Sequence, residues 1–310
     1  MKVAYIFPGQ GAQCVGMGRD VYEKFTSSRR VLQQADEALG FSLSGLCFEG
    51  PEDELLKTIN VQPAIVAVSL ALLSAAREHM GDGNFPAPSY VAGHSLGEYT
   101  ALAVSGALST STTICLARER GRLMHHAGQI KPGAMMAVIG LDEASLSEIC
   151  IHTNTDIANF NCPGQMVISG TAVNLDKAGE MAKAKGAYRV IPLQVSGAFH
   201  TSLMEPASQG LSDYLNTIDF KNTAVPIIAN TTAQEINSAD SVKEELIRQL
   251  CHSVQWQHSI EYMINKGVDT FIEIGPGKVL SGLIKRINKS AKTINICDAE
   301  SIRNLDFAKV

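Results

Sequence analysis

The segment "YVAGHSLGEY", residues 90–99, places Ser95 between two glycines in a Gly-x-Ser-x-Gly pattern. A run typical of a strand precedes Ser95, and a helix is expected to begin near Glu98. This is the context of a nucleophile elbow, where a tight turn exposes a serine hydroxyl for attack on an acyl carbon. Free N–H groups at the start of the helix could stabilise the resulting oxyanion. A serine in an ordinary loop is the alternative, because the bare pattern is weak.

A nucleophilic serine needs a general base, since its hydroxyl is barely ionised at neutral pH. Four histidines are candidates: His94, His125, His126 and His200. The side chain of His94, adjacent to Ser95 on the turn, should point away from it, and the pair at 125–126 is expected to face solvent or to pack. His200 stands where the chain is expected to pass from a small unit back into a larger one. That junction borders a cleft, so His200 is the candidate base, with a structural histidine as the alternative.

Two further segments could complete such a site. The glycine-rich "FPGQGAQ" lacks the Gly-Lys-Ser/Thr ending of a phosphate-binding P-loop. Its place after the first strand instead suits a ligand-binding loop that supplies a second oxyanion donor. One of Arg118, Arg120 and Arg122 could reach the cleft and select a carboxylate-bearing acyl group through a bidentate pair. A solvated helix face is the alternative for all three.

The composition is that of an ordinary globular protein, with 310 residues, 45% hydrophobic and 18% charged. A net charge of −5 argues against a nucleic-acid-binding surface. The longest apolar run, 64–76, is too short to span a membrane and predicts a buried helix. The seven scattered cysteines form no C-x-x-C pair and no H-x-x-x-H occurs, so we expect reduced thiols in a cytoplasmic protein and no metal site.

Alternating strand and helix patterns predict an α/β core with a parallel sheet. Its expected strands include 3–7 and 89–92, and its expected helices include 21–39 and 62–80. The texture changes between 129 and 195, where the order β-α-β-β-α-β predicts a small ferredoxin-like unit. The expected division is therefore a catalytic unit of residues 1–128 and 196–310, an insert of residues 129–195, and a cleft between them.

Several ordered segments together resemble the malonyl-CoA:acyl-carrier-protein transacylases over nearly the whole chain. They are "FPGQGAQCVGMG", "TINVQPA", "GHSLGEYTAL", "RGRLM", "NFNCPGQMVISG", "VSGAFHTSLM", "VQWQHSIEYM" and "EIGPGKVLSGLIKRI". One modest departure is Ala12-Gln13-Cys14, where serine or threonine is common at the first or last place. The resemblance implies an α/β-hydrolase-like core with a ferredoxin-like insert, in agreement with the strand order.

The resemblance also implies a role for each of seven residues. Ser95 would be the acyl-accepting nucleophile and His200 its general base, in a Ser-His dyad whose histidine is oriented by a backbone carbonyl. The remaining assignments are the backbone N–H groups of Gln10 and Leu96 as the oxyanion hole, Arg120 as the partner of the malonyl carboxylate, Gln255 lining the site near the histidine, and Phe199 as the residue of the malonyl-selecting form of its segment.

The implied reaction is transfer of a malonyl group from malonyl-CoA to the phosphopantetheine thiol of acyl carrier protein, through a malonyl-serine, for fatty-acid chain extension. A cytoplasmic monomer without bound cofactor, nucleic-acid partner or membrane partner is expected. Three alternatives stay open: a free-standing malonyl acyltransferase that loads a polyketide synthase, a serine esterase or thioesterase, and a catalytically silent module that docks carrier proteins.

Overall fold

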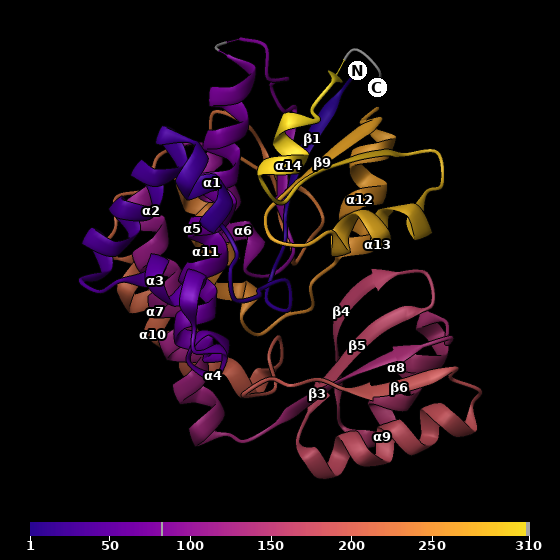
Figure 1. The fold of residues 1–310 in the computed structure, drawn as a ribbon. Helices are drawn as coiled ribbons and strands as arrows, with labels where there is room; N and C mark the ends of the chain where they lie inside the picture. The colour runs from indigo at the N-terminus through magenta and orange to yellow at the C-terminus, as the bar shows by residue number, and fades with distance from the viewer. Residues whose placement is uncertain (82, 308–310) are drawn as a thin grey trace.

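The computed structural model describes residues 1–81 and 83–307, and it contains two β-sheets formed by different parts of the chain (Figure 1). The larger sheet comprises β1 (Val3–Phe7), β2 (Tyr90–Gly93), β7 (Ile227–Ile228), β8 (Glu235–Ile236), β9 (Thr270–Ile274) and β10 (Lys292–Ile296). Its strand order is β10-β9-β1-β2-β7-β8. Neighbours run parallel from β10 to β7, and β8 pairs antiparallel with β7. The expected parallel core of an α/β fold is confirmed.

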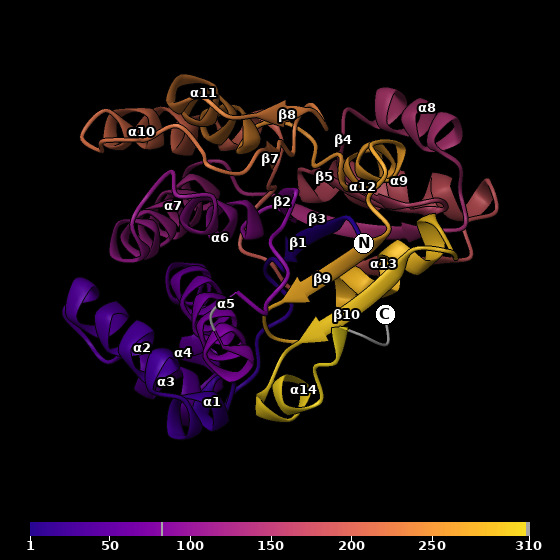
Figure 2. The ribbon, with the colours of Figure 1, turned by 90° about the horizontal axis from the view of Figure 1, so that it is seen from above.

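Helices surround this sheet, some packed on its two faces and others on those helices. The sheet and these helices together are called the large unit below. The helices are α1 (Arg19–Lys24), α2 (Thr26–Leu39), α3 (Leu43–Glu49), α4 (Glu52–Leu56), α5 (Thr58–Met80), α6 (Gly97–Val104), α7 (Thr110–Ile130), α10 (Glu205–Leu215), α11 (Ala239–Gln249), α12 (Trp256–Asn265), α13 (Val279–Ile287) and α14 (Ala299–Arg303). Figure 2 shows α5 and α6 on one side of the strands and α12 and α13 on the other.

The side chains of β1 alternate between the two cores that these helices form. Tyr5 and Phe7 pack into the core that contains α5 and α6, whereas Ala4 and Ile6 pack into the core that contains α12 and α13. A strand buried on both faces requires a continuous apolar run, which is the pattern at residues 3–7. The sheet is thereby packed on both faces, and the loops that leave the carboxyl ends of β1 and β2 begin at its buried strands.

The helix α5 is long and apolar enough to cross a membrane by length and composition alone. In the folded chain, 83% of its most apolar window is buried inside the protein, as is typical of a core helix. The buried helix predicted from the apolar run at 64–76 is therefore confirmed. The helix begins at Thr58, earlier than the expected residue 62.

One predicted helix is wrong in extent. The pattern predicts a single helix over 21–39, but the chain forms α1 and α2 with a break at Phe25. Phe25 has an extended backbone (φ −122°, ψ 126°), and its N–H closes α1 by donating to the carbonyl of Val21. Because the apolar spacing continues across one extended residue, periodicity does not reveal such a break.

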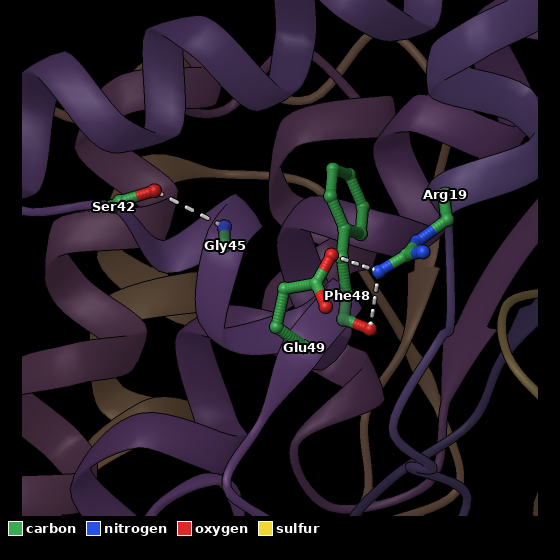
Figure 3. Close-up of polar contacts among 5 residues, drawn as sticks. All are labelled: Arg19, Ser42, Gly45, Phe48 and Glu49. Carbon is green, nitrogen blue, oxygen red and sulfur yellow. Dashed lines mark hydrogen bonds and ion pairs between the residues drawn. The ribbon is translucent and has the colours of Figure 1, made fainter.

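Polar contacts hold both ends of the short helix α3 (Figure 3). At its start, the hydroxyl of Ser42 accepts a hydrogen bond from the N–H of Gly45 at 3.1 Å, which is an N-cap. At its end, the guanidinium of Arg19 donates to the carbonyl of Phe48 at 2.9 Å and pairs with Glu49. Because Arg19 begins α1, these contacts join α3 to the segment that follows the glycine-rich loop.

The second sheet lies in residues 134–192, which are called the small unit below. It contains β3 (Ala134–Ile139), α8 (Glu143–Thr153), β4 (Asp156–Cys162), β5 (Gln165–Gly170), α9 (Ala172–Ala184) and β6 (Arg189–Pro192). The strand order is β4-β5-β3-β6 with antiparallel pairing throughout. The chain order β-α-β-β-α-β with this strand order is ferredoxin-like, so the expected small-unit fold is confirmed.

Backbone hydrogen bonds join one edge of the small unit to the large unit. Asn159 in the edge strand β4 forms a parallel bridge with Val254. The N–H of Phe160 donates to the carbonyl of Val254 at 2.9 Å, and the N–H of Val254 donates to the carbonyl of Ala158 at 2.8 Å. The two units are therefore attached along β4, beside the cavity described next.

Candidate active site

Ser95 lies at the turn between β2 and α6, in a left-handed backbone conformation (φ 49°). The flanking glycines leave no room for side chains. A Cβ on Gly93 would lie 1.8 Å from the carbonyl carbon of Gly97, and a Cβ on Gly97 would lie 2.0 Å from the carbonyl oxygen of Phe7. The Gly-x-Ser-x-Gly spacing is thus a steric requirement of a turn packed between β2, α6 and the end of β1.

The hydroxyl of Ser95 and the imidazole of His200 are within hydrogen-bonding distance, with 2.8 Å between Oγ and Nε2. The other ring nitrogen, Nδ1, is 2.7 Å from the carbonyl oxygen of Gln249. Since a carbonyl only accepts, Nδ1 carries the proton and Nε2 is left as the acceptor for the serine hydroxyl. The N–H of His200 also donates to the carbonyl of Leu250 at 3.1 Å.

The environment of His200 keeps its ring neutral. Burial, followed by the positive charge of Arg120, lowers the pKa of His200 from 6.5 to about 3. The imidazole is therefore free to accept a proton across the physiological pH range.

Arg120 enters the same site from α7, and its side chain is only 1% exposed. Nη2 donates to Oγ of Ser95 at 3.0 Å and to Oε1 of Gln249 at 2.9 Å, while Nη1 donates to Oε1 of Gln62 at 2.9 Å. All three partners are neutral, and Nε is buried without a partner among the described residues. The guanidinium also lies over the ring of Tyr99, 5.1 Å from its centroid. A buried cation with spare donors is suited to bind a carboxylate.

The two backbone amides expected to form the oxyanion hole both belong to residues that line the cavity. Within the described chain, the N–H groups of Gln10 and Leu96 donate to no protein acceptor. The loop carrying Gln10 passes against the elbow, because a Cβ on Gly9 would lie 2.4 Å from the carbonyl oxygen of His94. Glycine at position 9 therefore permits the close approach that brings both amides to one cavity.

Ser95, His200 and Arg120 open onto a cavity of about 650 Å³ between the two units. The large unit contributes the elbow, the glycine-rich loop and the start of α13, and the small unit contributes apolar side chains such as Met135 and Val167. Phe199, which precedes His200, lines the same cavity. The volume and mixed lining suit a small acyl group on a long arm.

The other candidate histidines and arginines have different surroundings. Nε2 of His94 is 2.8 Å from Oδ1 of Asn161, and His125 and His126 are exposed on α7. Arg118 donates to Asn60, and Arg122 pairs with Glu119 at the surface. Of these groups, His200 and Arg120 are the ones that contact the hydroxyl of Ser95.

Gln255 does not line the cavity, contrary to the sequence expectation. It follows α11 and precedes α12, where its Oε1 accepts a hydrogen bond from Nδ1 of His258 at 2.7 Å. The glutamine that contacts His200 is Gln249, at the end of α11, whose backbone carbonyl holds His200 and whose side chain holds Arg120. The sequence "EELIRQL" contains no local signal that marks this glutamine.

Within residues 1–81 and 83–307, no group of three or more histidine, cysteine, aspartate or glutamate side chains could hold a metal ion. All seven cysteines lie in this part of the chain and are free thiols. The groups that face the cavity are a hydroxyl, an imidazole, a guanidinium and backbone amides, a set suited to acyl transfer by nucleophilic catalysis.

The similarities of the chain to known proteins agree with this chemistry. The family model of the acyl transferase domain matches residues 4–304. The malonyl CoA-acyl carrier protein transacylase of Bacillus subtilis (strain 168) is 45% identical over 306 residues, which cover 97% of this chain and 95% of that protein. The protein of the same name from Staphylococcus aureus (strain MRSA252) is 41% identical over 307 residues, which cover 97% of both chains.

Solved structures extend the similarity to three dimensions. The acyl-carrier-protein-S-malonyltransferase of Bartonella henselae has a TM-score of 0.94 and 42% identity, with 98% of both chains covered. A malonyl-transacylase in complex with its type II PKS acyl-carrier protein has a TM-score of 0.93 and 38% identity, again with 98% of both chains covered. The chain belongs to the malonyl CoA-acyl carrier protein transacylase family of acyltransferases.

Proposed function

We propose that this protein transfers a malonyl group from malonyl-CoA to the phosphopantetheine thiol of acyl carrier protein, through a malonyl ester of Ser95. The observation that carries the proposal is the convergence of one hydroxyl, one neutral imidazole and one buried guanidinium. Oγ of Ser95 is 2.8 Å from Nε2 of His200 and 3.0 Å from Nη2 of Arg120. Family membership indicates the same substrates, because the relatives are named for them.

The first half-reaction acylates the enzyme. Nε2 of His200 accepts the hydroxyl proton as Oγ of Ser95 forms a bond to the thioester carbon. The negative charge that develops on the carbonyl oxygen is stabilised by the N–H groups of Gln10 and Leu96. The carbon–sulfur bond then breaks, and His200 returns the proton to the thiol of coenzyme A. Gln249 stabilises the imidazolium in between, through its carbonyl bond to Nδ1.

The second half-reaction repeats these steps with another thiol. The phosphopantetheine thiol of the carrier protein gives its proton to His200 and attacks the malonyl ester, and Ser95 leaves with that proton. No cofactor or metal takes part in the proposed cycle. The ester must persist until the thiol arrives, so the apolar lining contributed by the small unit serves to disfavour attack by water.

Arg120 provides selection for malonyl groups. A malonyl carboxylate replaces neutral partners of the guanidinium with an anion, and a bidentate pair leaves the thioester carbonyl within reach of Ser95. An acetyl group offers no such partner. Phe199 limits the space beside the α-carbon and so favours malonyl over methylmalonyl units.

We further propose that the protein supplies fatty-acid chain extension as a cytoplasmic monomer, with no nucleic-acid or membrane partner. The proposed units are residues 1–128 with 196–310, and the insert 129–195. A role in loading a polyketide synthase is the second candidate, because one similar structure is a complex with a type II PKS acyl-carrier protein. Transfer rates to carrier proteins of both kinds, measured side by side, distinguish the two.

The central test is labelling with radioactive malonyl-CoA. We expect one label per chain, absent in Ser95→Ala and retained in Ser202→Ala, an exposed serine two residues from His200. The label should pass to carrier protein when it is added. Absence of label on Ser95 would favour a silent docking module, and release of free malonate at a rate independent of carrier protein would favour a thioesterase.

A further inference from the structure

A buried carboxylate lies directly behind the elbow and is not used by the mechanism above. Glu98 is in the first turn of α6 and is 1% exposed. Its Oε1 accepts a hydrogen bond from the backbone N–H of Asn230 at 3.0 Å, and its Oε2 accepts one from Nε2 of Gln249. The two partners lie after β7 and at the end of α11, so one side chain connects three segments that meet at Ser95.

The Asn230 branch holds the elbow from both sides. Nδ2 of Asn230 donates to the carbonyl of Gly93 at 2.7 Å, and its Oδ1 accepts from the N–H of Ser95 at 2.7 Å. These bonds bracket the left-handed turn, whose φ of 49° is one that serine seldom adopts. Because Glu98 binds the backbone N–H of Asn230, it also positions the Asn230 side chain that forms these two hydrogen bonds.

The Gln249 branch connects the base and the guanidinium. The carbonyl of Gln249 orients His200, its Oε1 accepts from Arg120, and its Nε2 donates to the carbonyl of Ser95 at 2.9 Å as well as to Glu98. A guanidinium can only donate, so the amide oxygen of Gln249 must face Arg120 and its NH₂ must face Glu98. Both oxygens of Glu98 therefore meet donors, as an ionised carboxylate requires.

We propose that Glu98 is a positioning residue for malonyl transfer: it aligns Asn230 and Gln249 so that Ser95 and His200 meet in the reactive geometry, and it supplies the countercharge of Arg120 through the Gln249 amide. The proposal rests on the proposed function. It assigns a role to the glutamate of "GHSLGEY" that neither the elbow sterics nor the dyad chemistry requires.

The charged and titratable groups around Glu98 make the proposal testable by pH. They are Glu245 on α11, Arg120 on α7, Tyr99, which follows Glu98 on α6, and His200, which shares Gln249 with it. Burial and the like charge of Glu245 raise the pKa of Glu98 well above its usual value, while Arg120 lowers it. As pH falls, Glu98 is therefore protonated at a higher pH than an ordinary glutamate. If malonyl transfer needs the ionised form, the pH profile of kcat declines on the acid side over that range, and this decline is called the acid limb below.

Glu245 offers a matched control. It is also a buried carboxylate, 4% exposed, and it accepts hydrogen bonds from the N–H and the hydroxyl of Thr231, neither of which contacts Ser95 or His200. The N–H of Asn230 lies near it as well, but that N–H donates to Oε1 of Glu98 at 3.0 Å. Glu245→Gln should keep kcat within about threefold of the wild type. It should also move the acid limb to lower pH, because it removes the like charge that raises the pKa of Glu98.

In Glu98→Gln the amide NH₂ faces one of two donors, so one contact is lost. We expect kcat for malonyl transfer to fall roughly ten- to hundredfold, as for one charged hydrogen bond felt in the transition state. Single-turnover acylation of Ser95 should slow in parallel, KM for malonyl-CoA should change less than kcat, and the acid limb should disappear. Near-ultraviolet circular dichroism and thermal unfolding verify that the variant is folded.

A folded Glu98→Gln enzyme with the wild-type kcat and pH profile would overturn the proposal, as would an equal loss of kcat in Glu245→Gln. If Glu98→Gln does not fold, Asn230→Ala serves as the test, because it removes the side-chain hydrogen bonds to Gly93 and Ser95 and leaves Glu98 in place. Unchanged kcat in that variant contradicts the positioning role. Failure of the proposed function is recognised separately, since the wild-type protein would then transfer no malonyl group at all.

Discussion

Replacing Arg120 by alanine should change substrate preference more than it changes catalysis in general. The guanidinium is 1% exposed, and its three side-chain hydrogen bonds go to neutral groups. A malonyl carboxylate bound there forms a buried charge pair, and removing one partner of such a pair costs about 2–5 kcal/mol. At about 1.36 kcal/mol per factor of ten, kcat/KM for malonyl-CoA should fall roughly 30- to 5,000-fold.

Comparison with acetyl-CoA, which has no carboxylate, isolates the contribution of the charge pair. The variant also loses the bond from Nη2 to Oγ of Ser95, but that loss affects both substrates and cancels in their ratio. The ratio of kcat/KM for malonyl-CoA to that for acetyl-CoA should therefore fall by nearly the whole factor. Arg120→Lys retains a charge without the planar fork and should give an intermediate ratio.

The assay is transfer of labelled malonyl and acetyl groups to one carrier protein, with folded enzyme measured by thermal unfolding. Rates must be corrected for the fraction of folded enzyme, because Arg120→Ala leaves Oε1 of Gln62 and Oε1 of Gln249 without a donor. Each unsatisfied oxygen should lower the free energy of unfolding by about 1–3 kcal/mol. Arg122→Ala removes an exposed arginine of the same helix and should keep both rates within about twofold. Equal loss of malonyl and acetyl transfer in Arg120→Ala would refute the reasoning and leave the arginine a structural role.

Three further predictions follow from the same geometry. The folded state holds His200 neutral down to about pH 3, whereas the unfolded state protonates it near pH 6.5, so the free energy of unfolding falls as pH drops through this window. In urea titrations, His200→Gln should reduce the dependence of that free energy on pH by about 1.4 kcal/mol per pH unit. An unchanged dependence contradicts the lowered pKa. Phe199→Ala should raise methylmalonyl relative to malonyl transfer roughly tenfold in competition assays, whereas a constant ratio would place the selection elsewhere. Gly93→Ala should lower the free energy of unfolding by about 4 kcal/mol or more, because the new Cβ would lie 1.8 Å from a backbone carbon. Gly282→Ala places its Cβ in open space on α13 and should raise the free energy of unfolding by about 0.5–1 kcal/mol. Similar effects of the two variants would contradict the steric account.

The elbow could be predicted because its requirements are local. Gly93 and Gly97 are demanded by backbone atoms a few residues away or in the neighbouring strand, and strand and helix patterns flank Ser95 directly. The α+β insert, expected at 129–195 and observed with its strands and helices over 134–192, could also be predicted, because each of its elements has its own periodicity. From the residues alone, His200 could be placed only through the expected junction between the two units, which is a statement about topology. The resemblance to the family indicated the same residue.

Gln249 could not be predicted in the same way. Its contact with His200 uses a backbone carbonyl, which every residue has, and its contact with Arg120 depends on which turn of α11 reaches the site. Resemblance to the family led to Gln255 instead, six residues further on and beyond the end of the helix. The break at Phe25 could not be predicted either, because one extended residue leaves the spacing of apolar side chains almost unchanged.

The backbone bridge between Asn159 and Val254 has a mechanical consequence. It fastens the small sheet along β4, and a second attachment lies beyond the opposite edge strand, β6, where the hydroxyls of Ser196 and Thr58 are 2.8 Å apart. Val254 lies five residues after Gln249, whose carbonyl oxygen is 2.7 Å from Nδ1 of His200, so one segment of the large unit contacts both the small sheet and the imidazole. The wall of the cavity that the small sheet forms is therefore set in place by the same stretch of backbone that orients His200.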